Sequence, residues 1–270
     1  MIYKIIAPSD VLRAYIKQFW LFDSEESMTR EEVLLPSGYL QIVFNLGHAE
    51  WQSKKGKRFH TDTNLELRGQ QMGPSITRMI GRDIILGINF HPHTACCFLN
   101  DKAALFSNNI FDLCDVFGND MALLHEALLS ENDLTARINI LETFLVTKLR
   151  KCKIEEKRTA FLGYITTSLI KEVTTPNRVR KMVVETGYSE LHIQRLFHEY
   201  IGVTPKELQK IHRFHASLRQ LNTLRGTLTS VAYHCGYADQ AHFIREFKSF
   251  TGITPSVYKP ELFPSATGFL

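Results

Sequence analysis

The stretch Gly236-Tyr-Ala-Asp-Gln-Ala-His-Phe-Ile-Arg-Glu-Phe-Lys-Ser-Phe-Thr-Gly-Ile-Thr-Pro255 decides the fold of the C-terminal part, because a version of it has already occurred about fifty residues earlier. The earlier copy runs from Gly187-Tyr-Ser through Phe197 to Gly202-Val-Thr-Pro205. Both copies also place an arginine and a histidine at matching offsets. Two copies are too few for a solenoid, so the repeat indicates one supersecondary unit used twice.

In each copy a glycine separates two short segments with helical periodicity. Gly187 and Gly236 can take the positive φ that a sharp turn requires. Ser189 and Asp239 stand where a side chain caps the helix that follows. The apolar residues after these caps recur three and four positions apart, which is typical of a helix with one buried face. The first unit is expected to begin at Thr175-Pro176, a cap followed by a proline. The sequence therefore predicts two helix-turn-helix units.

The second helix of each unit leaves similar side chains on its outer face. Arginine can pair with O6 and N7 of guanine, and glutamine with N6 and N7 of adenine. An exposed arginine and glutamine are usually only solvated surface, but a doubled pattern with matching turns and cores favours DNA binding. The outward residues are Glu190, Leu191, Gln194, Arg195 and His198 in the first unit, and Gln240, Ala241, Ile244, Arg245 and Lys248 in the second.

Residues from about 160 to 260 resemble the DNA-binding domain of the AraC/XylS family of transcription regulators, and the run from Gly236 to Tyr258 is close to that family's signature. The resemblance implies an activator with two helix-turn-helix subdomains joined by one long helix. Both recognition helices would enter the major groove on one face of the duplex. The first copy departs at Leu208, where the second has Tyr258, an inward position that bears on packing. Carried across by position, the base-facing residues would be Leu191, His192, Gln194, Arg195, Gln240, Ala241, Ile244 and Arg245.

A long helix is predicted between the two units. Thr204-Pro-Lys-Glu207 has the form of a capping box with proline at the first helical position. An apolar stripe then continues until Gly226. About 20 helical residues span roughly 30 Å, close to the roughly 34 Å between successive major-groove faces. A rigid spacer of this length lets one chain contact two adjacent segments of the groove.

Composition and charge fit a DNA-binding protein of the cytoplasm. The chain has 270 residues with 44% hydrophobic and 22% charged side chains, enough for two folded domains. Residues 1–150 carry 15 Lys+Arg against 18 Asp+Glu, a net −3, whereas residues 151–270 carry 17 against 10, a net +7. Positive charge on the half with the repeat suits phosphate contacts. Five cysteines without a C-x-x-C pair, no signal-peptide pattern and no membrane-length apolar run favour a reducing cytoplasm without membrane contact.

The first 90 residues predict a β-rich domain, and the segment after them predicts helices. Short apolar runs are separated by glycine and proline, as in a small barrel or sandwich. Six aromatic residues of this part, Trp20, Phe22, Tyr39, Phe44, Trp51 and Phe90, are expected mainly in the core, with a cavity lining as the alternative. The predicted strands are Val33–Leu35, Tyr39–Leu46, Leu65–Arg68, Ile76–Ile80 and Ile84–Phe90, and the predicted helices are Asp120–Leu129 and Asp133–Leu149.

Leu35-Pro-Ser-Gly38, Val43-Phe-Asn-Leu46 and Gly87-Ile-Asn-Phe-His-Pro92 resemble a cupin-like sensor domain often joined to such DNA-binding halves. The predicted fold class is thus α+β: a small cupin-like barrel or sandwich with closing helices, then an all-α domain. The expected divisions are residues 1–150 for sensing or dimerisation, 151–158 as linker, 159–262 for DNA binding and 263–270 as tail. The expected partners are double-stranded DNA, RNA polymerase, a small-molecule effector and a second copy of the chain.

The alternative is a metal-dependent cupin enzyme with an accessory DNA-binding domain. His91-x-His93 suggests a metal site, because cupin enzymes use a histidine pair followed closely by a glutamate. Residues 94 to 98 contain no acidic side chain, and two histidines fall short of a facial triad. Motifs of serine hydrolases and P-loop nucleotide enzymes are absent. We therefore expect neither enzyme activity nor a metal or cofactor, and the prediction is a sequence-specific transcription regulator.

Overall fold

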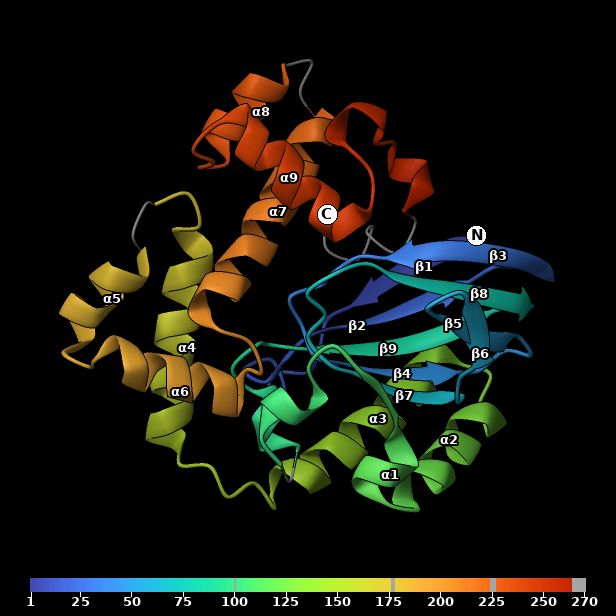
Figure 1. Cartoon of the computed structure of the whole chain (residues 1–270). Coiled ribbons are helices and arrows are strands. Elements are labelled where there is room, and N and C mark those ends of the chain that lie inside the picture. Colours follow the sequence, from blue (N-terminus) through green and yellow to red (C-terminus); the bar gives the residue numbers. More distant parts are fainter. Residues whose placement is uncertain (100, 176–177, 224–226, 264–270) are drawn as a thin grey trace.

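The computed structural model describes residues 1–99, 101–175, 178–223 and 227–263, and its N-terminal half consists of two antiparallel sheets (Figure 1). One sheet has six strands in the order β1 (Ile2–Ile6), β2 (Ile16–Asp23), β9 (Ile84–Phe90), β4 (Gln41–Asn45), β7 (Leu65–Arg68) and β10 (Ile110–Asp112). The other has four, in the order β3 (Met28–Leu34), β8 (Ser75–Gly81), β5 (Glu50–Lys55) and β6 (Arg58–Thr61).

The four inner strands of the six-stranded sheet, β2, β9, β4 and β7, are buried on both faces. Alternate residues of a strand point to opposite sides, so Phe19 of β2 joins the large core on the outer face while Trp20 faces the second sheet. At Gly87 of β9, which pairs with Trp20 in the register, a Cβ would lie 2.0 Å from the indole ring. Only glycine leaves room for that ring.

Three helices cover the outer face of the six-stranded sheet (Figure 1). Their buried residues, among them Met121, Leu128, Leu141 and Leu145, pack with those of the strands in one hydrophobic cluster. These helices are α1 (Leu113–Phe117), α2 (Asp120–Ser130) and α3 (Leu134–Leu149), after the short 3-10 turns η1 (Ala95–Cys97) and η2 (Ala103–Phe106).

The C-terminal half is helical, with α7 running between two smaller groups of helices (Figure 1). Each group has its own hydrophobic cluster, one around Phe197 and one around Phe247. The helices are α4 (Glu156–Lys171), α5 (Arg178–Thr186), α6 (Glu190–Tyr200), α7 (Pro205–Thr223), α8 (Leu228–His234) and α9 (Gln240–Thr251), followed by the 3-10 turns η3 (Pro255–Val257) and η4 (Pro260–Leu262). No helix of the described ranges is long and apolar enough to cross a membrane.

The two halves touch along several elements. Leu35, from the loop after β3, belongs to the hydrophobic cluster of α7 and α9. Ser107 Oγ donates to the Gly202 carbonyl at 2.6 Å, and His215 Nε2 lies 2.7 Å from the Pro36 carbonyl oxygen. Gly202, with φ +94°, sits so close to the N-terminal half that a Cβ would lie 2.8 Å from Ser107 Oγ.

The predicted α+β fold class is confirmed, and the five predicted strands correspond to β3, β4, β7, β8 and β9. Strands β1, β2, β5, β6 and β10 were not predicted. The linker 151–158 stays a prediction, and α4 begins within that segment, at Glu156. The expected helix start at Thr175-Pro176 and the expected end of α7 at Gly226 involve Pro176 and Gly226, which lie outside the described residues.

Candidate nucleic-acid interface

The predicted turn glycines and the predicted caps of the second helices are present in both units. Gly187 and Gly236 have φ of +70° and +75°. Ser189 Oγ accepts from the backbone N–H of His192 at the start of α6, and Asp239 accepts from that of His242 at the start of α9. A side-chain acceptor at this position satisfies one of the N–H groups that a helix start leaves without a partner. Both second helices are therefore held firmly at the end that follows the turn.

The inner faces of α6 and α9 are buried and the outer faces are not. Ile193 and Phe197 in α6, and Phe243 and Phe247 in α9, are fully buried. Most of the eight residues predicted to face bases lie at the surface, as helical periodicity requires. The exposed residues are Leu191, His192, Arg195, Gln240, Ala241 and Arg245, and the half-buried ones are Gln194 and Ile244.

Some of these side chains are oriented by neighbours. Thr229 Oγ1 donates to Gln240 Oε1 at 2.7 Å, so the amide nitrogen of Gln240 is the end that can donate to a base. Gln194 Nε2 donates to Glu190 Oε1 at 3.2 Å. The His192 ring stacks on Tyr188 with 4.6 Å between centroids. These contacts restrain the side chains before a ligand arrives, which lowers the entropy lost on binding.

Helix α9 is fixed to α7 by a bidentate ion pair. Arg213 Nε and Nη2 lie 3.0 Å and 2.6 Å from the two oxygens of Glu246, and both side chains are largely buried. The Arg213 guanidinium also lies 4.6 Å from the centroid of the Tyr237 ring. Bidentate pairing of this kind sets orientation as well as energy.

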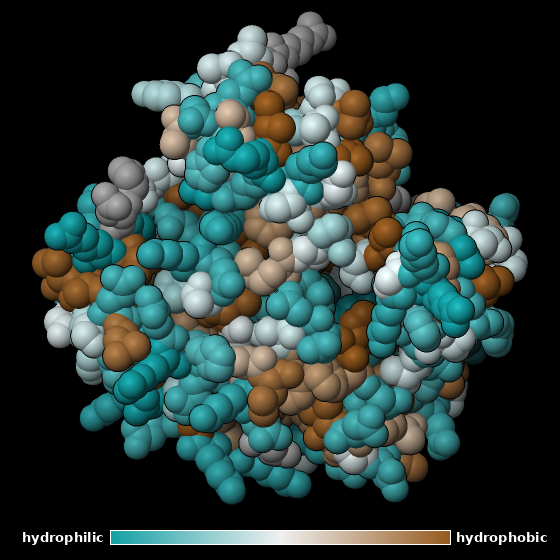
Figure 2. Space-filling view, in the orientation of Figure 1, coloured by the Kyte–Doolittle hydropathy of each residue, from teal (hydrophilic) through white to brown (hydrophobic). Residues whose placement is uncertain are grey.

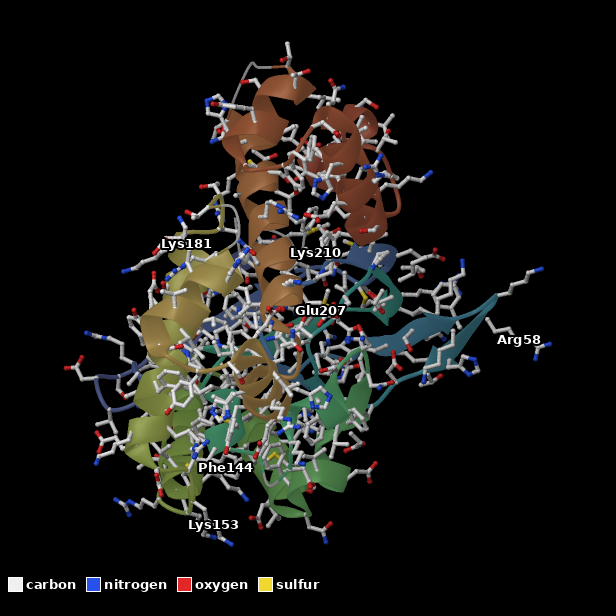
Figure 3. All side chains as sticks on the ribbon, turned by 60° about the vertical axis from the view of Figure 1, so that its left-hand side comes forward. Arg58, Phe144, Lys153, Lys181, Glu207 and Lys210 are labelled. Atoms are coloured by element: carbon white, nitrogen blue, oxygen red, sulfur yellow. The ribbon has the colours of Figure 1, made fainter. Side chains whose placement is uncertain are left out.

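A basic groove between α5, α6 and α7 was missed by the sequence analysis. Arg180, Lys206 and Lys210 line it together with Glu190, and the three cations are exposed. Figure 3 shows Lys181 of α5 and Lys210 of α7 on the helical side, with Arg58 at the far tip of the β5–β6 hairpin. Lys206 and Lys210 are four residues apart, and this spacing on one helix face was the available signal.

The side chains of His91 and His93 lie next to each other after β9. Their rings stack with 5.8 Å between centroids, and His93 Nδ1 lies 3.2 Å from Thr166 Oγ1 of α4. Burial lowers the pKa of His93 to about 4, with the neighbouring His91 adding to the shift. Across the described ranges, no group of three or more His, Cys, Asp and Glu side chains could hold a metal ion. His93 packs the segment after β9 against α4.

A second site lies between the two sheets, where a cavity of about 100 Å³ is enclosed by aromatic and charged side chains. Of the six aromatic residues considered, Trp20, Phe22 and Trp51 line this cavity, whereas Phe44 and Phe90 belong to the core on the outer face. Tyr39 packs edge-on against His212 of α7 instead.

Ion pairs line the cavity, but its polar groups are not all satisfied. Arg30 lies 3.4 Å from Glu32, and Arg68 Nε donates to Glu66 at 2.5 Å. Burial raises the pKa of Glu66, against the opposing effect of Arg68. Arg30 Nη1 and Gln52 Oε1 are buried without a hydrogen-bond partner. Orphaned buried polar atoms in a cavity are costly unless water or a ligand satisfies them.

Comparison with known proteins supports the helical half as a functional unit. A family model described as a helix-turn-helix domain matches residues 182–260, and a model described as a domain of unknown function, DUF6597, matches residues 4–112. The HTH-type transcriptional activator AarP of Providencia stuartii is 28% identical over 74 residues, which are 27% of this chain and 55% of AarP.

Residues 182–260 form an AraC-type helix-turn-helix domain. This confirms the resemblance stated from the sequence. The F1 operon positive regulatory protein of Yersinia pestis is 30% identical over 89 residues, 33% of this chain and 30% of that protein. ToxT of Vibrio cholerae is 14% identical and aligns over 91% of this chain and 97% of its own with a TM-score of 0.48. The AraC-type domain contains the end of α5 and all of α6 to α9.

Proposed function

We propose that this protein is a sequence-specific DNA-binding transcription regulator, an activator that contacts two adjacent segments of the major groove with α6 and α9. One observation carries the proposal: two capped recognition helices at either end of α7 expose arginines at matching positions, Arg195 and Arg245. The 19 residues of α7 span roughly 28 Å, near the repeat of the major groove. The names of two relatives, an activator and a positive regulatory protein, support activation as opposed to repression.

The basic groove of Arg180, Lys206 and Lys210 supports phosphate contacts beside the base contacts. Phosphate contacts fix the position of a protein on the duplex, whereas contacts to base edges carry the sequence preference. Figure 2 shows that hydrophilic side chains cover most of the face seen there, with hydrophobic residues in smaller patches. We assign the phosphate backbone of the DNA to the basic groove. We assign the base edges to Leu191, His192, Gln194, Arg195, Gln240, Ala241, Ile244 and Arg245.

The test starts with selection of a preferred duplex from a random pool by the full chain. In an anisotropy titration with that duplex, Arg195→Ala and Arg245→Ala should each cost about 1–3 kcal/mol and relax the preference at one position. The matched control is Arg58→Ala, because Arg58 is exposed at the hairpin tip of the other half. Unaltered affinity and preference in both recognition-helix variants would contradict the assignment.

We further propose that the cavity between the sheets binds the effector. Three carboxylates of its lining, Glu32, Asp62 and Glu66, face two arginines, Arg30 and Arg68. This excess of acceptors, together with the indole walls, favours a small ligand with hydrogen-bond donors and a flat apolar face. Such a ligand would satisfy the orphaned Gln52 Oε1.

Trp20 and Trp51 make this testable, since they are the only two tryptophans of the sequence and both line the cavity. A screen of small metabolites should find compounds that change tryptophan emission and raise the unfolding temperature together. Trp51→Phe should weaken the binding of such a compound, and Val11→Ala, an exposed residue between β1 and β2, should not. Emission changes without any gain in unfolding temperature would argue against a ligand site there.

The remaining partners and the location are also proposals. We propose a second copy of the chain at the groove between α2 and α3, where Leu123 is 66% exposed beside Ile140 and Phe144. Sedimentation with Leu123→Glu tests this, because a buried charge would separate a dimer. We propose that the protein acts in the cytoplasm. We also propose that it contacts RNA polymerase, because an activator bound at a promoter acts on that enzyme.

The alternative of a metal-dependent enzyme has no observation in its favour. The side chains of His91 and His93 contact the Arg13 carbonyl and Thr166. No third ligand approaches them in the part of the chain that the structure describes. Elemental analysis of the purified protein separates the two functions, since stoichiometric iron, manganese or zinc would support the enzyme.

A further inference from the structure

The loop between β7 and β8 reaches from the N-terminal half to both groups of helices. Its Met72 is half-buried and packs against the hydrophobic cluster around Phe197 and also against the one around Phe247. Among the residues that the structure describes, no other hydrophobic side chain belongs to both clusters. Met72 therefore contacts both helix-turn-helix units at once.

A side chain in this position links the orientations of the two units. Methionine is flexible and fills irregular gaps between packed surfaces. Protein interiors are packed so closely that a rotation of one unit about α7 would open a void beside Met72. The rotation would also expose apolar surface that is now covered, which costs free energy. The packing of Met72 thus favours one arrangement of α6 and α9.

Hydrogen bonds hold the loop that carries Met72. The backbone N–H of Met72 donates to Asn108 Oδ1 at 2.8 Å, and the backbone N–H of Asn108 donates to the Gln70 carbonyl at 2.8 Å. Gln70 Nε2 donates to the Gly38 carbonyl at 3.1 Å. The loop is therefore anchored on two other segments of the N-terminal half, one around Gly38 and one around Asn108.

These two anchoring segments contact the helical half themselves. A Cβ at Gly38 would lie 3.3 Å from Ile211 Cγ2 in α7. Ser107, next to Asn108, donates to the Gly202 carbonyl just after α6. The loop, α7 and the end of α6 therefore belong to one connected framework.

The contacts with the N-terminal half leave the base-facing sides of both recognition helices free. The N-terminal half meets the first unit at Gly202, after the last residue of α6, and Gly73 lies next to Ser249, near the end of α9. Arg195 and Arg245 are exposed in this arrangement. The contacts are therefore compatible with bound DNA, and they favour positioning of the helices over blocking.

We propose that Met72 is a positioning residue that holds α6 and α9 in the arrangement that fits two adjacent segments of the major groove. The inference rests on the proposed function. Met72 acts through the packing of the two units and not through a contact with DNA. A second unit that is already oriented when the first one binds loses less freedom, which raises the combined affinity. Loss of Met72 should therefore relax the required spacing and leave each unit's own binding unchanged.

The experiment uses the full chain in anisotropy titrations with three duplexes. These are the selected duplex, the same duplex with one base pair inserted between the two segments, and a duplex with a single segment. The parent should bind the selected duplex more tightly than the inserted one. Met72→Ala should lower this affinity ratio at least about fivefold, the lower end of the usual coupling between two sites. Its affinity for the single segment should equal that of the parent.

The affinity ratio separates positioning from a loss of folded protein, because a smaller folded fraction weakens binding to all three duplexes equally. Met72→Leu nearly keeps the side-chain volume and should restore the ratio. Asn108→Gly keeps the positive φ of +59° and removes the acceptor for the Met72 N–H, so it should lower the ratio as Met72→Ala does. Met28→Ala is the matched control, a half-buried methionine at the end of β3 opposite to Leu34, and should leave the ratio unchanged.

The outcomes distinguish this inference from the proposed function. A parent that binds no duplex, or binds the selected and the inserted duplex equally, would contradict the proposed function and this inference together. If the parent discriminates between the two duplexes and Met72→Ala does so to the same extent, the role of Met72 is overturned and the proposed function stands. A ratio lowered as much by Met28→Ala as by Met72→Ala would overturn it as well.

Discussion

At the scale of single residues, Gly87 shows how one missing side chain shapes the cavity. A Cβ at this position would lie 2.0 Å from Trp20 Cε2 and 2.3 Å from its Cζ2. Overpacking of a filled site costs about 1–3 kcal/mol. We therefore expect Gly87→Ala to lower the free energy of unfolding by at least that amount and to shift tryptophan emission, as measured by denaturant titration with fluorescence detection.

Gly73 provides the control for this substitution. Its φ is not in the left-handed region, and the nearest atom to an added Cβ is the Ser249 carbonyl oxygen at 4.0 Å. Gly73→Ala should leave stability and emission close to those of the parent. Equal stability of the two variants would show that Trp20 can move aside at no cost.

The outward positions of α6 and α9 could be predicted because they depend only on helical period. Arg195 and Arg245 lie at the surface as expected, and Phe197 and Phe247 are buried. The need for glycine at position 87 could not be predicted, since its cause is a ring on a neighbouring strand, Trp20, 67 positions away in the chain. The base contacts themselves remain a prediction.

At the scale of elements, the Arg213–Glu246 pair holds α9 to α7. Removing one partner leaves a charge buried without compensation, which costs about 3–5 kcal/mol. Arg213→Ala and Glu246→Ala should each destabilise the protein by about that amount in thermal or denaturant unfolding. Arg213→Met with Glu246→Leu should be much milder, because no charge is left behind. A double variant as unstable as the single ones would mean that packing, and not the orphaned charge, dominates.

The docking of α7 on the N-terminal half should depend on pH. Burial lowers the pKa of His212 to about 3, and Lys17 and Arg219 add to the shift. Burial also lowers the pKa of His215 well below its usual value. An undocked histidine takes up a proton below about pH 6.5 whereas the docked one does not. Docking is therefore fully favourable above pH 6.5 and weakens as the pH falls towards 3.

At pH 5 the loss for His212 should reach about 2 kcal/mol. Lys17, whose pKa burial lowers to about 8, stays charged in both states over this range and does not contribute. The radius of gyration from small-angle scattering should rise between pH 7 and pH 5. His212→Phe should move that rise to lower pH, and His234→Phe, an exposed position, should not. Identical curves for the parent and His212→Phe would refute this mechanism.

Several strands escaped prediction for a physical reason. In β2, Ile16 and Phe19 pack into the core on one face while Trp20 and Phe22 face the other sheet. A strand buried on both faces shows no alternation of apolar and polar residues. The sequence of β2 therefore lacks the period of two by which a strand is predicted. Strands β5 and β6 are mostly polar and lie at the end of the smaller sheet. The helices α2 and α3, with one buried face each, were predicted within one residue at either end.

At the scale of the whole molecule, the charge split predicts how salt acts on DNA binding. The logarithm of the affinity should fall linearly with that of the salt concentration, and loss of one phosphate contact should reduce the slope by about 1. Lys210→Ala, in the basic groove, should reduce this slope by about 1 and should weaken binding to all duplexes nearly equally. Lys57→Ala, an exposed lysine of the β5–β6 hairpin, is the control and should leave the slope unchanged.

How the halves meet could not be predicted from the sequence. Ser107 contacts Gly202 and Pro36 contacts His215 across long separations in the chain. The sequence around these residues has no pattern that marks a contact with a distant segment. Only the tertiary packing determines which residues meet. The cavity likewise depends on the two sheets facing each other, which strand periodicity does not specify.

The most direct test of the central claim changes the DNA and leaves the protein intact. The selected duplex is compared with versions in which 5 or 10 base pairs are inserted between the two contacted segments. Since α7 is a rigid spacer of roughly 28 Å, we predict that both insertions reduce the affinity to that of a duplex with one segment alone. Retention of the full affinity in either insertion would contradict a single chain that holds two recognition helices at a fixed spacing.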